Sequence, residues 1–364
     1  MPPIDISVVV CTYNRSELLR GAVESLMRLR TEDRLRYEVL VIDNASTDDT
    51  PQVIEELKHI ATVPLRSVRE MRKGVAAARN CGIRSAHGDW IAFFDDDELA
   101  DPLWLLELLD TAKRKDACCA GGAVRLALPD DVLAELPMVC RHSLGESATP
   151  AAPCRFHRKL TITTGNLMVH RIVFDEIGLF DETLREAGED TDLSSRMWAA
   201  GIESWFVPSA IIYHTVAPYR LEERYFRWTS QRNGLHLARR ERHAWGLFLF
   251  PAVLFARVAR FVVKHLPQLL RARATGSRPA RLAALCQWWR IEGYLRAVAS
   301  WVTPRWWRQE EFFASMDFRN ERQMFSTPAA TAPVAEESAA PPLACWSDRD
   351  ATPSGGEIQD EVRQ

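Results

Sequence analysis

The chain has 364 residues, of which 47% are hydrophobic and 26% charged, and its formal net charge is −3. This length can bury one large core or two, and the composition is that of a soluble folded protein. The eight cysteines contain no C-x-x-C pair, which excludes zinc-site spacing and a secreted disulfide framework. We expect reduced thiols in a cytosolic protein, and no signal peptide, because no basic and apolar leader precedes the first strand-like run.

The first part of the chain alternates short β-branched runs with amphipathic segments. The runs at 6–10 and 38–42 read ISVVV and EVLVI, as expected for strands of a parallel sheet covered on both faces. In chain order we predict strands at 6–10, 38–42, 62–68 and 90–94, and helices at 16–29, 49–58 and 74–86. This alternation predicts a doubly wound α/β sheet, in which ligands bind at the carboxyl ends of the strands.

The pattern loosens after a predicted helix at 102–115. Residues 129–158 are rich in Pro, Ala and Ser and are predicted to form a loop or lid. Order returns in the segments 161–169 and 174–180 and in a helix at 189–200 that Gly201 ends. We predict three parts, which are an α/β domain at 4–216, a basic helical extension at 217–325 and a disordered tail at 326–364.

An acidic cluster directly follows the predicted strand at 90–94. The sequence IAFF continues into four acids, Asp95 to Glu98. One or two acids at a strand end are ordinary turn or N-cap residues, but four in a row favour a bound cation. In extended chain Asp95 and Asp97 project to the same side, and Mg²⁺ or Mn²⁺ takes one or two carboxylates together with phosphate oxygens. The cluster therefore predicts a divalent metal site.

The turn after the first strand lacks the glycines of a dinucleotide-binding fold. G-x-G-x-x-G is replaced by Thr12-Tyr13-Asn14, which offers an aromatic ring and polar groups, so a nicotinamide enzyme is disfavoured. A second predicted strand ends at Asp43-Asn44. These polar residues should meet the acidic cluster at one edge of the sheet.

Four segments together resemble family 2 glycosyltransferases, the inverting, nucleotide-sugar-dependent enzymes with the GT-A fold. They read SVVVCTYNR, VLVIDNASTDDT, GVAAARNCGIRSAHGDWIAFFDDDELADPLWL and TTGNLMVHRIVFDEIGLFDETLREAGEDTDLSSRMWAAG, and they cover most of 7–201. The following AIIYHT resembles the family's closing strand, whereas the part after residue 219 matches only loosely. The resemblance implies a GT-A type, mostly parallel sheet with a C-terminal helical extension, and a hexosyltransferase activity typical of bacterial polysaccharide assembly.

The resemblance also implies a donor site. Tyr13 would stack on the base, usually uracil in this family, Asp43 would accept from its ring N–H, and Arg79 would approach the diphosphate. From the residues alone, the alternatives are a core aromatic for Tyr13 and a solvated helical residue for Arg79. The nucleotide-binding set implied in this way is Thr12, Tyr13, Asn14, Asp43, Arg79, Asp95 and Asp96.

For the metal, the resemblance implies Mn²⁺ or Mg²⁺ held by Asp97 and Asp95, with His214 as a third metal or phosphate contact. The triple aspartate lets the D-x-D register slide by one, so the sequence leaves open which aspartate contacts the ribose and which the metal. His214, at the end of an apolar run, could equally be structural.

On the acceptor side, Asp190 resembles the general base that takes a proton from the acceptor hydroxyl. The alternative is a carboxylate placed to favour the N-terminal helix dipole. Glu189 and Asp192 compete for the role, although Asp192 lies roughly 200° round the helix from Asp190. Asn166 and Glu189 are predicted to contact the acceptor or sugar, and inversion requires the base and the leaving group on opposite faces of the sugar.

The segment after residue 219 is basic and rich in tryptophan. Between 219 and 311 it contains 17 Arg and 1 Lys against 6 Glu, with 7 of the 12 Trp. Residues 244–266 begin with an uncharged stretch and then meet Arg257, Arg260 and Lys264 on one face. This pattern favours a helix lying on a membrane surface, with a spanning helix or a packed helical cap as alternatives.

The leading hypothesis is therefore transfer of a sugar from a nucleotide donor, UDP-linked by the resemblance, to a glycan or lipid-linked acceptor. The expected location is cytoplasmic, peripheral on the inner face of the plasma membrane. A transfer-inactive nucleotide-sugar-binding partner subunit is the alternative, and a nucleotidylyltransferase is disfavoured by the first loop. Nucleic acid is not expected as a partner, because no recognition module is present.

Overall fold

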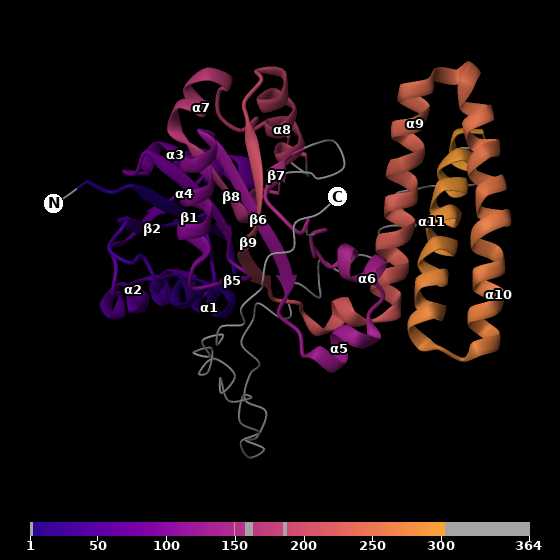
Figure 1. Cartoon of the computed structure of the whole chain (residues 1–364), viewed down its shortest axis with the longest axis horizontal. Helices are drawn as coiled ribbons and strands as arrows, with labels where there is room; N and C mark the ends of the chain where they lie inside the picture. Colours follow the sequence, from indigo (N-terminus) through magenta and orange to yellow (C-terminus); the bar gives the residue numbers. More distant parts are fainter. Residues whose placement is uncertain (1–2, 149, 157–162, 185–187, 303–364) are drawn as a thin grey trace, which may run out of the picture. The chain divides into compact units, whose positions relative to one another are not determined.

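The computed structural model describes residues 3–148, 150–156, 163–184 and 188–302. Its first half is a parallel sheet covered by helices, as the alternation predicts (Figure 1). The strands are β1 (Ile6–Thr12), β2 (Tyr37–Asp43), β3 (Leu65–Arg69) and β4 (Trp90–Asp95), and the helices are α1 (Ser16–Met27), α2 (Thr50–Ile60) and α3 (Val75–Ser85). β1 pairs in parallel with β2 and β4, in a register that sets Thr12 beside Asp43 and Cys11 beside Asp95.

The second half extends the same sheet with mixed strand directions. In the described residues nine strands form one sheet, with the order β3-β2-β1-β4-β8-β6-β9-β5 and with β7 on β9. The added strands are β5 (Glu98–Ala100), β6 (Cys119–Leu126), β7 (Cys154–Arg155), β8 (Leu167–His170) and β9 (Ser204–His214). β8 is antiparallel to both β4 and β6, whereas β6 and β9 are parallel. The predicted GT-A type fold with a helical extension is confirmed, and the antiparallel pairings of β5, β7 and β8 make the sheet mixed.

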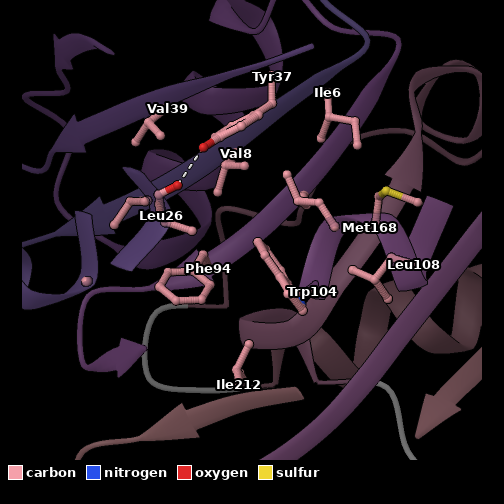
Figure 2. Close-up of a cluster of buried hydrophobic side chains, with 14 of the residues drawn as sticks. Ile6, Val8, Leu26, Tyr37, Val39, Phe94, Trp104, Leu108, Met168 and Ile212 are labelled. Atoms are coloured by element: carbon pink, nitrogen blue, oxygen red, sulfur yellow. Dashed lines mark hydrogen bonds between the residues drawn. The ribbon is translucent and has the colours of Figure 1, made fainter. Parts of the chain in front are cut away.

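Two apolar layers hold the sheet between helices. On one face, inward residues of β1, β2 and β4 pack against α1, α2 and α4 (Trp104–Lys115), and Figure 2 shows this cluster around Phe94 and Trp104. The hydroxyl of Tyr37 donates to the carbonyl of Leu26 at 2.6 Å, which satisfies the polar group that Tyr37 brings into this layer. On the other face α3, α7 (Arg171–Ile177) and α8 (Glu189–Ala199) pack against Phe93 and Leu167. Because side chains alternate along each strand, successive residues serve opposite layers.

The prediction of a loop or lid at 129–158 is wrong for part of that segment. It contains α5 (Asp130–Glu135), α6 (Met138–Ser143) and β7. Prolines 129 and 137 occupy the N-cap positions of the two short helices, where the fixed φ of proline is tolerated. Cys140 of α6 is buried, and its Sγ lies 3.6 Å from Sγ of Cys286 in the C-terminal helices.

The C-terminal part of the described chain is helical. After η2 (Pro218–Leu221) come α9 (Glu223–Arg260), the π-helical η3 (Phe261–His265), α10 (Leu266–Thr275) and α11 (Arg278–Val302). Gly246, with φ 64° and ψ 178°, breaks α9 into two limbs that run in opposite directions beside α11 (Figure 1). A Cβ on Gly234 or Gly293 would collide with the backbone of the facing helix, so these glycines permit the close crossing of α9 and α11.

The predicted division at residue 217 falls between β9 and η2, and it stays a prediction. The predicted tail at 326–364 lies outside the described residues.

Candidate active site

The strand ends of the parallel half open into a cleft of about 730 Å³. Its walls come from the loop after β1, the start of α3, the turn after β4, the end of β9 and η2. The residues that line it are Cys11 to Arg15, Asn44, Lys73 to Val75, Ala78, Arg79, Asp95 to Asp97, His214 and Arg220. The predicted edge of the sheet is therefore the edge that carries the cavity.

The loop after β1 presents Tyr13 to solvent at the cleft. The side chain is 45% exposed, and Nζ of Lys73 lies 5.8 Å from its ring centroid, so Tyr13 is not a core aromatic. Asn14 has a φ of 53° and is fixed on both sides, since its amide donates to Oγ of Ser46 and its Oδ1 accepts from the amide of Thr47. The ring of Tyr13 is thus an open aromatic face on a held loop.

Asp43 is buried beneath this loop. Its Oδ1 accepts from the amide of Ser46 at 2.8 Å, and Nε of Arg69 lies 3.8 Å from its Oδ2. The neighbouring Asn44, not Asp43, lines the cleft itself. Asp43 thus supports the turn, and a contact between it and a bound base requires access past that turn.

The three aspartates divide into two that face the cleft and one that faces inward. Asp95 and Asp97 keep side-chain exposures of 45% and 17%, whereas that of Asp96 is 5%. Oδ2 of Asp96 accepts from the hydroxyl of Thr12 at 2.8 Å, and its Oδ1 accepts from Nη1 of Arg15 at 2.6 Å. In this geometry Asp95 and Asp97 are the two aspartates open to the cleft, and the hydrogen bonds among Thr12, Arg15 and Asp96 hold the turn.

Burial and cations act differently on these carboxyls. Burial raises the pKa of Asp96 to about 6, despite the charge of Arg15. Burial would also raise the pKa of Asp97, but the hydrogen bond of His214 and the charges of Arg15 and Arg220 outweigh it and hold that pKa at about 2. Asp97 is therefore an ionised group on the cleft wall.

Glu98, the fourth acid of the cluster, is a buried structural group. Its side chain accepts from the amide of Asp95 at 3.0 Å, and burial raises its pKa well above the ordinary value. It packs so closely under Gly165 that a Cβ there would meet its carboxyl. Two of the four acids therefore build the site, and the other two face the cleft.

Arg79 joins the aspartate turn to the start of α8. Its Nη1 donates to Glu189 Oε1 at 2.8 Å and to Asp190 Oδ1 at 3.0 Å, and its Nη2 lies 3.6 Å from Asp95 Oδ1. The guanidinium is buried, which excludes the solvated alternative. Arg79 also lines the cleft, yet its donors are committed to three carboxylates, so its first role here is to hold them together.

Asp190 is the more open of the two acids that begin α8. Its side chain is 33% exposed against 11% for Glu189, and Oγ1 of Thr164 donates to its Oδ1 at 2.8 Å. Burial raises the pKa of Asp190, and the charge of Arg79 opposes that shift. Asp192 points away and pairs with Arg196 at 2.8 Å. The geometry thus separates Asp190 from both of its competitors.

Asn166 lies in the core, not in the cleft. It is 1% exposed, its Oδ1 accepts from Nε1 of Trp104 at 2.7 Å, and its Nδ2 donates to the carbonyls of Ala123 and Ala210. This commitment of the amide corrects the expected sugar contact to a structural role, that of locking the turn before β8.

His214 lies between the carboxylate of Asp97 and the guanidinium of Arg220. Its Nδ1 lies 3.5 Å from Oδ1 of Asp97, and its Nε2 accepts from Nη1 of Arg220 at 2.9 Å. A guanidinium can only donate, so Nε2 is unprotonated and the proton of the neutral ring is on Nδ1, facing Asp97. Nε of Arg220 is buried with no hydrogen-bond partner in the described part of the chain.

Comparison with known proteins agrees with this architecture. The profile described as Glycosyl transferase family 2 matches residues 7–178. The succinoglycan biosynthesis protein ExoM of Rhizobium meliloti (strain 1021) is 30% identical over 259 residues, which are 68% of this chain and 80% of ExoM. This chain is a family 2 glycosyltransferase. The glycosyltransferase AglE of Haloferax volcanii is 26% identical over 59% of this chain and 68% of its own length.

The fold of the family is also found in a solved structure. The mannosyltransferase PcManGT from Pyrobaculum calidifontis, in complex with GDP-Man and Mn²⁺, superposes with a TM-score of 0.52 over 81% of this chain and 87% of its own, at 19% identity. At this identity the match speaks for the fold alone.

The carboxylates of this glycosyltransferase suit a metal shared with a substrate rather than a protein-only site. Among the residues that the structure describes, no three His, Cys, Asp or Glu side chains are grouped to hold an ion by themselves. Asp97 offers an ionised carboxylate, and Asp95, whose pKa burial raises, brings a second carboxyl to the same cleft wall. Mg²⁺ and Mn²⁺ are commonly bound through one or two carboxylates and phosphate oxygens, so this donor set fits them. Both nitrogens of His214 are already engaged, which makes it a partner of Asp97 more than a ligand.

Sequence reasoning missed three cations and one hydroxyl of the site. Arg15, Lys73 and Arg220 line the cleft, and Thr164 holds Asp190. Arg15 directly follows the quoted loop and could have been found from its position. Arg220 could not, because it lies on η2, beyond the last matched segment.

Proposed function

We propose that this enzyme is a metal-dependent, inverting glycosyltransferase that moves a sugar from a UDP-linked donor to a glycan or lipid-linked acceptor. The observation that carries the proposal is the Arg79 bridge, which links Asp95 on the donor side to Asp190 on the acceptor side. A donor bound between Tyr13 and the aspartates would present its sugar toward Asp190, with the acceptor hydroxyl approaching from the far side.

Each residue has a distinct part in this proposal. The ring of Tyr13 stacks on the base, while Lys73 and Arg220 bring positive charge to the diphosphate. Asp190 accepts the proton of the acceptor hydroxyl as that oxygen attacks the anomeric carbon, and the diphosphate departs from the opposite face. Glu189 keeps Arg79 in place beside the base. Mn²⁺ or Mg²⁺ held by Asp97 and Asp95 would supply positive charge to the departing diphosphate.

The biological setting follows from the relatives. ExoM is a succinoglycan biosynthesis protein, and a further relative, 31% identical over 26% of this chain, is a UDP-Glc glucosyltransferase that acts on a diphosphoundecaprenol-linked sugar. The name of ExoM supports polysaccharide assembly and that of the second relative supports a lipid-linked acceptor, and we place the reaction at the cytoplasmic face of a bacterial membrane. In this view residues 4–216 are the catalytic domain and 217–325 are the extension that faces the membrane.

A ligand panel tests the donor. Thermal shifts of the purified chain should rise with UDP-sugars in Mn²⁺ and fall back in EDTA, because a ligand that binds only the folded state raises the melting temperature. Larger shifts with GDP- or TDP-sugars would refute the UDP assignment. The panel is followed by an assay of UDP-sugar hydrolysis without acceptor. Binding without any metal-dependent hydrolysis or transfer would instead identify the transfer-inactive partner subunit.

A further inference from the structure

The turn between the two limbs of α9 exposes a set of large apolar side chains, here named the apolar tip. Phe248 is 98% exposed, and the tip also comprises Trp245, Leu247 and Leu249, each more than half exposed. Gly246 makes this turn, and Figure 1 shows the two limbs of α9 meeting there at the end of the helices. Single exposed apolar residues are common in soluble proteins, but contiguous groups mark interaction surfaces.

The apolar tip is presented by a packed frame. Phe250 is buried between the limbs and stacks on Tyr294 of α11 at a centroid distance of 6.3 Å, with Trp301 on its edge. The helical segment Glu223–Ala272, which includes the break at Gly246, is by length and composition a candidate membrane span. Only 11% of its most apolar 18-residue window is buried. A core helix of that hydropathy would be mostly buried. The apolar side chains of this window are therefore exposed in the folded helices, even though Phe250 is packed between them.

Cations collect at the base of the apolar tip. Arg239, Arg242 and His243 line a groove of about 360 Å³ together with Gly246, Leu247 and Trp301. The guanidinium of Arg242 lies 4.5 Å from the ring centroid of Trp301. The nearby Glu241 is turned into the bundle, where Arg257 and Tyr294 bind it. We name Arg239 and Arg242 the cationic collar.

An apolar end bordered by cations and tryptophans is complementary to a bilayer surface with anionic lipids. Phosphate headgroups accept from arginine, indole rings favour the interface, and the apolar side chains enter the acyl region. Arg242 lies four residues before Gly246, or roughly 6 Å along the first limb of α9, so the turn can enter the bilayer to the roughly 5–10 Å depth of an interfacial apolar face while Arg242 stays at the headgroups. Arg257 is tied inward to Glu241, so it cannot serve as the headgroup contact that its spacing suggested.

We propose that the apolar tip inserts into one leaflet of a bilayer containing anionic lipid, with the cationic collar at the level of the headgroups. This inference rests on the membrane location in the proposed function and specifies the part of the chain that makes the contact. It accounts for the exposure of Phe248 beside the turn at Gly246. It also predicts that the extension binds the membrane peripherally and does not span it.

The test uses the full chain and vesicles of phosphatidylcholine with or without one quarter phosphatidylglycerol. The wild type should co-sediment with the anionic vesicles at low salt, and carbonate should release it. Phe248→Glu with Leu249→Glu should lower the partition coefficient at least tenfold. The matched control, Ile60→Glu with Ile172→Glu, changes side chains of 57% and 56% exposure on α2 and α7 and should bind like the wild type.

A second pair of variants isolates the cationic collar. Arg239→Gln with Arg242→Gln should weaken binding to anionic vesicles several-fold and should have little effect on residual binding to neutral ones, because the collar acts through charge. Arg20→Gln with Arg34→Gln removes the same charge from the α/β part and should leave binding intact. Hydrogen exchange should slow in 245–256 when vesicles are added and should not change in α1.

Three results would overturn the proposal. They are no binding at low salt, equal binding by the Phe248 and Leu249 variant, or retention in carbonate, which indicates a spanning helix. Concentration-dependent dimers that the same variant abolishes, with no vesicle binding, would assign the tip to a second copy. UDP-sugar hydrolysis in solution is measured on every variant, so a failed donor assignment is distinguishable from a failed membrane assignment.

Discussion

The cleft and the helical extension depart from ordinary burial in opposite directions. The cleft buries charge, since Asp96, Glu98, Arg79 and Glu189 are each less than a tenth exposed. The extension exposes apolar surface, with Phe248 almost fully in solvent. Each departure costs folding stability, and each is held in place by a rigid frame, the sheet in one case and the packed helices in the other. Such local conflicts with the general rules of burial are typical of functional sites.

The comparison also separates two ways in which the chain uses arginine. In the cleft Arg15 and Arg79 bind carboxylates that would otherwise repel one another, so the cations allow an acidic site to fold. In the extension Arg239 and Arg242 border an apolar surface, and Arg242 lies over the ring of Trp301. Substitutions in the two regions should therefore have separable effects.

The largest effect is expected in the cleft, at Asp97. Asp97→Ala removes the ionised carboxylate that His214, Arg15 and Arg220 surround, and transfer in Mn²⁺ should fall below detection. UDP affinity in Mn²⁺, measured by calorimetry, should fall with it. Glu55→Ala, on the exposed side of α2, is the control. Full activity of the wild type in excess EDTA would remove the metal from the mechanism.

Asp190→Asn should lower kcat by a factor on the order of 10² to 10⁴ while donor affinity hardly changes. The amide keeps the shape of the side chain but cannot take the acceptor's proton. Asp192→Asn is the matched control, because Asp192 sits on the same helix and pairs with Arg196 instead. If Asp192→Asn or Glu189→Gln is the inactive variant and Asp190→Asn is active, the base has been misassigned.

The dependence of kcat on pH should follow the ionisation of Asp190. Burial raises the pKa of Asp190 and the hydroxyl of Thr164 opposes that shift, so the ionised base forms only above the usual range of an aspartate. The rate should rise with pH through this raised pKa. Thr164→Val removes the donor to the carboxylate and should move the acidic limb of kcat to higher pH. A shift toward lower pH would contradict the assignment.

An intermediate effect is expected at Arg220. Loss of a charged hydrogen bond to the diphosphate costs about 1.5–3 kcal/mol, so Arg220→Gln should lower kcat/KM for the donor by roughly 10- to 100-fold. Arg224→Gln, one turn along the chain and 55% exposed at its side chain, is the control. Equal losses in both variants would show that the effect comes from the net charge of the segment and not from the cleft.

The sequence predicted the sheet well because each of its early strands is a β-branched run that ends in polar residues. It predicted the acidic cluster for the same reason, but it could not separate the inward Asp96 from the outward Asp95 and Asp97, since side-chain direction depends on the turn. Asn166 was misread because an amide in a motif looks the same whether it meets a sugar or the core. The short helices α5 and α6 were missed because six residues carry too little periodicity, and their prolines read as loop.

The smallest effect is expected in the extension and concerns how its cations divide. Arg257 and Arg260 share a helical face. In the described part of the chain only Arg257 hydrogen-bonds an acidic side chain, with its Nε 3.0 Å from Oε1 of the buried Glu241. Arg257→Ala removes the charged hydrogen bond to that carboxylate and keeps the one from Tyr294, which should cost about 1–3 kcal/mol, seen as a fall of several degrees in the melting temperature. Arg260→Ala should have no measurable effect on the melting temperature. Equal falls would mean that Arg260 also stabilises the bundle, and no fall in either would mean that Glu241 needs no arginine, leaving Arg257 free to serve the membrane surface.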